Sequence, residues 1–135
     1  MLLVDTNILV AAADTSTPEH VACAAVLDEH ADLLVPAPVA VETAWMIESR
    51  LGVEAEATFV DAVATNEIEV VDLTAADWSR CRDLIVQYAD LRLGLVDASV
   101  VAVAERLKIT TVATLNRRDF AVVRPAHCDV LTLLP

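Results

Sequence analysis

Short runs of apolar residues alternate with longer amphipathic stretches along the chain. The apolar runs occupy residues 2–4, 33–35, 68–71, 109–113 and 130–133. Runs of this length with little polar alternation are typical of strands buried on both faces of a parallel sheet. The stretches between them have helical spacing and predict helices over residues 8–13, 18–30, 39–50, 54–65, 75–89 and 98–107. The pattern predicts an α/β fold with a central parallel sheet of about four to five strands flanked by helices.

Local signals mark where several of these helices begin. Asn7 is predicted to cap the first helix, Thr17 the second and Thr74 the helix over residues 75–89. At 135 residues, the chain is expected to form a single domain over residues 1–135. The faces that these helices are predicted to bury include Val21, Ala24, Ala25, Leu27, Ala57, Val60, Ala64, Trp78, Leu84, Ile85 and Tyr88.

One helix carries a carboxylate on its apolar stripe. Val39, Glu42, Trp45 and Met46 share one face of the helix over residues 39–50. A buried carboxylate without a partner is costly, so Glu42 needs a proton, a cationic partner or a metal ion. A satisfied core glutamate, or one at the rim of the stripe, is the alternative.

The composition favours a protein of the cytoplasm. Hydrophobic residues make up 56% of the chain and the mean hydropathy is +0.55, which predicts extensive burial or an exposed apolar surface for a partner. No apolar run approaches the ~18 residues of a membrane span, and no signal-peptide pattern opens the sequence. The cysteines, Cys23, Cys81 and Cys128, are expected to be small buried hydrophobes.

The charge balance argues against bulk electrostatic binding to nucleic acid. The formal net charge is -12 and the isoelectric point is near 4.4. Several basic residues nevertheless fall in the last third of the chain, so a local basic patch and a merely solvated face both stay open. These residues are Arg106, Lys108, Arg117, Arg118 and Arg124.

Acidic and polar side chains fall at corresponding places in the predicted fold. Asp5 ends the first buried strand, and Asn116 and Asp119 follow the strand over residues 109–113. Because strand ends of one polarity lie at one edge of a parallel sheet, we expect these groups to be neighbours. Asp97 heads a helix, where capping is the plainer explanation, and could join Glu42 in the same cluster.

Such a cluster would require a cation. Two carboxylates ~4 Å apart repel by roughly 4 kcal/mol at an effective dielectric constant near 20, so several together must take up protons or bind a positive ion. Oxygen ligands without Cys or His select a hard ion, Mg²⁺ or Mn²⁺. Such an ion polarises a phosphoryl oxygen and lowers the pKa of bound water, which is the chemistry of phosphodiester hydrolysis.

These motifs resemble those of PIN domains. They are V-D-T-N at residues 4–7, the lone Glu42 after a Pro-flanked strand, D-A-S at 97–99 and T-x-N-x-x-D-F at 114–120. In length and order the chain is similar to VapC-type toxins of bacterial toxin–antitoxin pairs. The resemblance implies a compact α/β fold and a Mg²⁺- or Mn²⁺-dependent endoribonuclease that cuts structured RNA such as tRNA or rRNA and so inhibits translation. It also implies a VapB-type antitoxin, a homodimer, and a heterotetramer or larger complex with the antitoxin.

The resemblance assigns roles to particular residues. Asp5 and Asp97 would be metal ligands, and Glu42 would bind the metal directly or through water, or activate the attacking water. Asp119 would be the fourth carboxylate, although in some family members the carboxylate stands at the position of Asn116. Supporting contacts to the ligands or to RNA phosphates would come from Thr6, Asn7, Thr114, Asn116, Arg117 and Arg118.

Two other functions stay open from the sequence. A phosphatase of the haloacid-dehalogenase type also places an Asp after its first strand, but it requires a second Asp two residues on, where this chain has Asn7. A catalytically degenerate PIN scaffold would only bind a partner. The presence of carboxylates at all the acidic positions argues against this scaffold.

Overall fold

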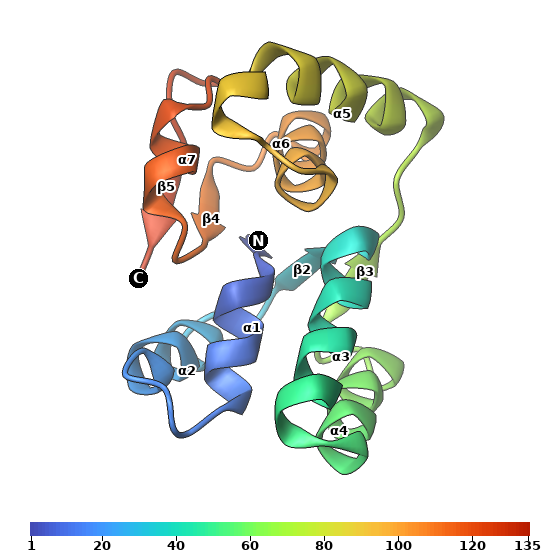
Figure 1. Ribbon diagram of the computed structural model, residues 1–135, viewed down its shortest axis with the longest axis vertical. Coiled ribbons are helices and arrows are strands. Elements are labelled where there is room, and N and C mark those ends of the chain that lie inside the picture. Colours follow the sequence, from blue (N-terminus) through green and yellow to red (C-terminus); the bar gives the residue numbers. More distant parts are fainter.

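A computed structural model describes residues 1–135 as a five-stranded sheet with helices on both faces (Figure 1). All strand pairs are parallel, and the strand order is β3-β2-β1-β4-β5. This architecture confirms the predicted α/β class. The strands are β1 (Leu2–Val4), β2 (Leu33–Pro36), β3 (Glu69–Val71), β4 (Thr111–Ala113) and β5 (Thr132–Leu134). The helices are α1 (Thr6–Ala13), α2 (His20–Asp28), α3 (Ala37–Leu51), α4 (Val53–Ala64), α5 (Ala75–Gln87), α6 (Leu95–Leu107) and α7 (Arg117–Val122), with a 3₁₀ turn, η1, at Ala89–Leu91.

The chain reverses its direction across the sheet at β1. It passes from β1 through β2 to β3 on one side, then returns to β4 and β5 on the other side of β1. Right-handed crossovers therefore place α1–α4 on one face and α5–α7 on the opposite face, as the lower and upper halves of Figure 1 show. The neighbouring ends of β1 and β4 form a topological switch point, where open α/β sheets hold their ligands.

The hydrophobic core lies around β1, β4 and α6. It contains 27 buried residues in one cluster, including every residue of β1. All residues from Ala98 to Ala104 of α6 are buried, because this helix packs between the sheet and α5. The burial of α6 on all sides explains its nearly continuous run of small and β-branched apolar residues.

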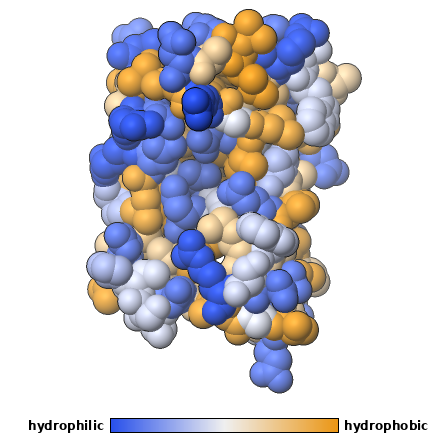
Figure 2. All heavy atoms as spheres, viewed as in Figure 1, coloured by the Kyte–Doolittle hydropathy of each residue, from blue (hydrophilic) through white to orange (hydrophobic).

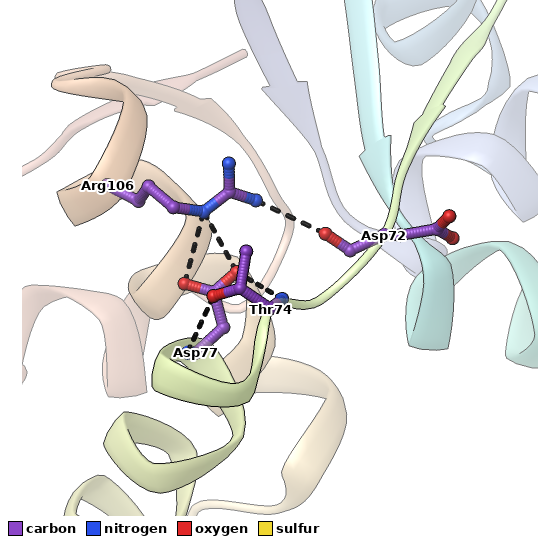
Figure 3. A network of polar contacts seen from close by, with 4 residues as sticks. All are labelled: Asp72, Thr74, Asp77 and Arg106. Carbon is purple, nitrogen blue, oxygen red and sulfur yellow. Dashed lines mark hydrogen bonds and ion pairs between the residues drawn. The ribbon is translucent and has the colours of Figure 1, made fainter.

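Two ion pairs join α5 to α6. Arg106 Nε lies 2.9 Å from Asp77 Oδ2, and Arg80 Nε lies 2.9 Å from Glu105 Oε1. Asp77 also completes a capping box with Thr74, and Arg106 donates to the main-chain oxygen of Asp72 (Figure 3). The network therefore fixes the connection between β3 and α5 as well as the start of α5.

Two predicted helix caps are wrong, and the third is confirmed. Asp5, not Asn7, caps α1, because Thr6 already has helical geometry and its N–H donates to Asp5 Oδ1. The second helix begins at His20, after Glu19, so Thr17 lies in the preceding turn. Thr74 caps α5 as predicted.

Several predicted core positions lie at the surface. Val21 is 78% exposed, Val60 51% and Ile85 36%, and Ala25, Ala57 and Ala64 are exposed too. Trp45 and Trp78 are 67% and 51% exposed. On α3 the buried residues are Val39, Thr43 and Ile47. Val39 was predicted, but Thr43 and Ile47 take the places predicted for Glu42 and Met46, so Glu42 lies at the rim of the core. The residues that α2, α4 and α5 turn inward instead are Cys23, Val26, Phe59, Ala62, Val63 and Cys81.

Much of the apolar excess of the chain thus reaches the surface. Figure 2 shows hydrophobic residues among hydrophilic ones in several places on one face, including the upper part, where α5 and α6 lie. None of the helices combines the length and the apolar character needed to cross a bilayer.

Candidate functional site

The predicted site residues gather where β1 and β4 end. Asp5 directly follows β1, and Thr114 directly follows β4, the strand that pairs with β1. The main chain joins the same two ends, since Asp5 N donates to the oxygen of Ala113 at 2.9 Å. The reversal of strand order therefore brings residues from opposite ends of the sequence to one edge of the sheet.

Asp5 is buried and held by hydrogen bonds at both carboxylate oxygens. It is 3% exposed; Thr6 N donates to Oδ1 at 2.8 Å, and Thr114 Oγ1 donates to Oδ2 at 2.8 Å. Burial raises the pKa of Asp5 above its usual value, an effect that the bonds from Thr114 and Thr6 oppose and the charge of Glu42 reinforces. The carboxylate thus has a fixed orientation but a destabilised negative charge.

The loop after β4 is fixed against the start of α1. Asn116 N donates to Thr114 Oγ1 at 3.0 Å, and Leu115 N donates to Asn7 Oδ1 at 3.0 Å. Asn7 therefore supports the loop of the site rather than the helix that follows it. Thr6 is also buried, and its hydroxyl has no hydrogen-bond partner.

Asn116 bridges two further carboxylates. Its Nδ2 donates to Asp119 Oδ2 at 3.1 Å and approaches Asp97 Oδ2 at 3.4 Å. Asn116 also caps α7, where its Oδ1 accepts from Asp119 N at 3.4 Å. The sequence predicted the position of this segment but not the short helix α7, which turns Asp119 back toward α6.

Asp97 is the centre of the electrostatic cluster. It lies in the first turn of α6, and Gly94 takes the capping position, so Asp97 is not the helix cap that the sequence left open. Burial raises the pKa of Asp97 to about 7, helped by the charges of Asp5, Asp119 and Glu42 and opposed by the amide of Asn116. Residues from three separate segments therefore act on one carboxylate.

Glu42 lies at the edge of this cluster. It is half-buried on α3, and its charge raises the pKa of both Asp5 and Asp97. Its side chain takes part in none of the hydrogen bonds or ion pairs that fix Asp5 and Asp119. Glu42 is thus the acidic residue of the cluster that the fold holds least firmly.

The two arginines after β4 have different surroundings. The Arg118 side chain is 83% exposed, and its Nε lies 3.1 Å from Asp119 Oδ1. Arg117 donates to the main-chain oxygens of Leu133 and Pro135, which secures the end of the chain. Arg118 is therefore free to present positive charge to solvent beside the carboxylates, whereas Arg117 is engaged.

The chemistry of the donor set fits a hard divalent cation. The cluster offers only oxygen ligands, from Asp5, Asp97, Asp119 and Glu42. The mutual repulsion of these carboxylates favours a bound positive charge. No three acidic, His or Cys side chains stand close enough together, as placed, to hold an ion. Binding would therefore require side chains to move, and Glu42 is the least constrained of the four carboxylates.

An apolar groove that the sequence did not predict adjoins the carboxylate cluster. It has a volume of ≈ 890 Å³ and lies between α3, the start of α6 and the connection from β3 to α5. Glu42 belongs to both the groove and the cluster. Other residues that line the groove are Val41, Trp45, Asp72, Leu73 and Trp78.

Comparison with known proteins gives the class of the protein. Residues 2–124 match the PIN domain family. The chain is also 33% identical over 135 residues to Ribonuclease VapC26 of Mycobacterium tuberculosis, a match that covers 99% of this chain and 100% of that protein. The chain therefore belongs to the PIN domain family and is of the VapC type, as its motifs predicted.

Solved structures of VapC proteins share the fold. The crystal structure of M. tuberculosis VapC20, described as a Sarcin-Ricin loop cleaving toxin, has a TM-score of 0.77 at 18% identity and covers 83% of this chain and 87% of its own. VapBC2 of Rickettsia felis, bound to a DNA fragment from its promoter, has a TM-score of 0.68 at 18% identity and covers 98% and 96%. At these identities the structures show the common fold.

Proposed function

We propose that this protein is an endoribonuclease toxin that depends on Mg²⁺ or Mn²⁺. The observation that carries the proposal is the convergence of Asp5, Glu42, Asp97 and Asp119 on the switch point of a PIN fold, where burial, reinforced by the charges of the neighbouring carboxylates, raises the pKa of Asp97 to about 7. Asp119 has a cationic partner in Arg118, but Asp5, Glu42 and Asp97 form no ion pair, which favours a site built to bind a cation over one built only to stabilise the fold.

Each carboxylate has a distinct role in this proposal. Asp5 and Asp97 would hold the ion, Asp119 would complete its coordination directly or through water, and Glu42 would orient the water that attacks the phosphodiester. The bound ion would supply a Lewis acid for the phosphoryl oxygen and lower the pKa of its water. The amide nitrogen of Asn116 contacts both Asp97 and Asp119 and so helps to orient the two carboxylates.

Thr114 and Thr6 have supporting roles. Their hydrogen bonds hold the Asp5 carboxylate in one orientation, which lowers the cost of arranging it around an ion. Asn7 holds the loop that carries Thr114 and Asn116. These three residues therefore act through the ligands rather than on the substrate.

The proposed substrate is a structured RNA such as tRNA or rRNA. A chain of net charge -12 cannot bind RNA by its overall charge, so the ion and Arg118 would supply the positive groups that meet the phosphates. The aromatic content of 4% provides no broad stacking platform, which favours recognition of a folded loop by shape and backbone. The description of VapC20 as a Sarcin-Ricin loop cleaving toxin supports this class of substrate.

A VapB-type antitoxin is the proposed partner. The R. felis relative in fold is a VapBC complex, and the extensive apolar surface of this chain provides area for such a partner. We further propose a homodimer that forms a heterotetramer or larger complex with the antitoxin. A toxin with this substrate and partner would act in the cytoplasm, where cleavage would inhibit translation.

Cleavage of purified RNA tests the proposal. We expect the wild type to cut tRNA or rRNA when Mg²⁺ or Mn²⁺ is present and to stop when EDTA is added. Asp5→Asn and Asp97→Asn should each reduce cleavage by roughly 10²-fold or more, because each removes a charge that holds the ion. Asp61→Asn, at an exposed position of α4, is the matched control and should cleave like the wild type.

The same experiment excludes the degenerate scaffold. A scaffold that only binds a partner would cleave no RNA in any variant while keeping its circular dichroism spectrum. Cleavage at wild-type rates by both Asp5→Asn and Asp97→Asn would contradict the assigned site.

A further inference from the structure

Asp119 is the one carboxylate of the cluster that has a cationic partner. Its Oδ1 accepts a hydrogen bond from Arg118 Nε at 3.1 Å, and its Oδ2 accepts one from Asn116 Nδ2 at 3.1 Å. The hydrogen bonds that hold Asp5 come instead from a main-chain N–H and a hydroxyl, which are neutral donors. A cation that binds at Asp119 therefore competes with a positive charge that the chain itself supplies.

The two partners of Asp119 are held with unequal strength. The side chain of Arg118 is 83% exposed, so water can replace its hydrogen bond, and exposed ion pairs of this kind contribute little to stability. Asn116 is anchored at three points, because its N–H donates to Thr114 Oγ1, its Oδ1 caps α7 and its Nδ2 also approaches Asp97. Arg118 is therefore the partner that leaves first when Asp119 takes another ligand.

The guanidinium of Arg118 has donors beyond this pair. Only Nε donates to Asp119, and the two terminal nitrogens have no partner within the chain. A guanidinium carries five N–H donors in a planar fork that matches the oxygens of a phosphate. While the pair persists, however, the negative charge of Asp119 lies beside the guanidinium and opposes an approaching phosphate. Arg118 is thus in place at the cluster but hindered as a phosphate contact until Asp119 has another cation.

We propose that Arg118 alternates between two partners: it neutralises Asp119 in the metal-free chain, leaves when a divalent ion binds there, and then binds a phosphate of the RNA. The inference rests on the proposed function and adds to it an order of binding. Without the ion, RNA meets a chain of net charge -12 in which every charge acting on Asp97 is negative. Arg118 therefore becomes a substrate-binding residue only once the ion is in place.

The coupling between ion and RNA runs in both directions. If the ion frees Arg118 for RNA, then RNA that holds Arg118 removes the competitor of the ion at Asp119. Each ligand therefore raises the affinity of the chain for the other by the same factor. An arginine that contacts RNA without competing for Asp119 gives no such effect. The two arrangements differ when Arg118 is removed and binding of the ion is measured alone.

Binding of Mn²⁺ to the full chain without RNA is the first measurement. Arg118→Gln removes the competitor and should bind Mn²⁺ about two- to fivefold more tightly than the wild type, the range that loss of an exposed ion pair allows. Arg124→Gln is the matched control, because it removes the same charge just after α7 but its side chain donates only to main-chain oxygens. This control should bind Mn²⁺ like the wild type.

A double-mutant cycle tests whether the effect acts through Asp119. Asp119→Asn should weaken Mn²⁺ binding, and adding Arg118→Gln to it should bring no gain, because the carboxylate for which Arg118 competes is absent. A gain of equal size with and without the Asp119 carboxylate would mean that Arg118 only repels the ion through space. That result would overturn the exchange of partners.

Cleavage of tRNA or rRNA at saturating Mn²⁺ is the second measurement. Arg118→Gln should raise KM several-fold with little change in kcat, and KM should become less sensitive to salt, since one phosphate contact is lost. Damage to the fold would not strengthen ion binding while it weakens RNA binding. An unchanged KM would contradict the contact between Arg118 and RNA, and unchanged or weaker Mn²⁺ binding would contradict its competition for Asp119.

Failure of this inference is separable from failure of the proposed function. A wild type that binds Mn²⁺ and cleaves RNA with the expected dependence on Asp5, while Arg118→Gln gains no Mn²⁺ affinity, would overturn the inference and leave the function standing. If Arg118→Gln gains Mn²⁺ affinity through Asp119 but the wild type cleaves no RNA, the competition is supported and the function is overturned.

Discussion

The hydroxyl of Thr114 donates a 2.8 Å hydrogen bond to Oδ2 of Asp5, across 109 positions of the sequence. The bond joins the ends of two neighbouring parallel strands, β1 and β4, and Thr114 is fully buried. It fixes one acidic side chain of the site and opposes the effect of burial on its pKa. The geometry of the cluster therefore depends on the pairing of the central strands.

Removal of this bond should move the pH dependence of metal binding. In Thr114→Val the carboxylate loses a donor that stabilises its charged form, so the pKa of Asp5 should rise further and Mn²⁺ binding should require a higher pH. The free energy of unfolding at neutral pH should fall by about 1–3 kcal/mol. Mn²⁺ titrations across a pH series measure the shift. Thr58→Val, which removes an exposed hydroxyl on α4, is the control, and a pH dependence shared by both variants would contradict the role of Thr114.

Asp97 should make the metal-free protein less stable as the pH rises. Its pKa is about 7 in the folded chain, against 3.8 for an unperturbed carboxyl, so the unfolded chain releases this proton first. The free energy of unfolding therefore falls between about pH 4 and pH 7 and the loss is complete above pH 7. With allowance for the partial exposure of Asp97, the free energy of unfolding of Asp97→Asn should exceed that of the wild type by about 1–2 kcal/mol at pH 8 and by little at pH 4.

Thermal unfolding at pH 4 and pH 8, with EDTA present, measures this difference. Asp61→Asn should follow the wild type at both values, since Asp61 is exposed. Mg²⁺ or Mn²⁺ at pH 8 should raise the Tm of the wild type, by the equivalent of about 2.7 kcal/mol at 100 times its Kd, and should stabilise Asp97→Asn by no more than about half as much at the same ion concentration. Equal stability of the wild type and Asp97→Asn at pH 8, both in EDTA, would refute the raised pKa of Asp97.

The ion pair between Arg106 and Asp77 should stabilise the fold more than a surface pair does. The side chain of Asp77 is 5% exposed, and Arg106 is its cationic partner. Arg106→Leu therefore leaves a buried carboxylate without a cation and should lower the free energy of unfolding by about 2–4 kcal/mol. Adding Asp77→Asn should restore part of the loss. Arg82→Leu breaks the exposed pair with Asp83 and should cost less than about 1 kcal/mol. Denaturant unfolding compares the variants, and equal losses in Arg106→Leu and Arg82→Leu would contradict the role of this network.

The sequence predicted which polar side chains lie close together better than it predicted the helix faces. Asp5, Thr114 and Asn116 could be placed together because they follow strands that a parallel sheet must bring to one edge. Asp119 could be expected near them, but its orientation comes from α7, a helix of six residues with too little periodicity to detect. Glu42 was predicted on a core stripe and lies at its rim.

Trp45 and Trp78 show why helix faces are harder to predict. Apolar periodicity identifies a face that avoids water but does not reveal whether the same chain or a partner covers it. On α3 and α5 the buried positions include polar residues, Thr43 and Asp77, which do not signal burial in the sequence. The tryptophans were therefore predicted as core although they lie at the surface.

Binding of Mn²⁺ to the purified protein, followed by calorimetry and electron paramagnetic resonance, tests most directly whether distant carboxylates hold one ion. The wild type should bind Mn²⁺ at one site above pH 7, and Mg²⁺ should compete for it. Asp5→Asn and Asp97→Asn should each lose at least about tenfold in affinity, because each removes a charged ligand of the ion. Unchanged Mn²⁺ affinity in both variants, with Asp61→Asn as the reference, would show that these carboxylates do not form a common metal site.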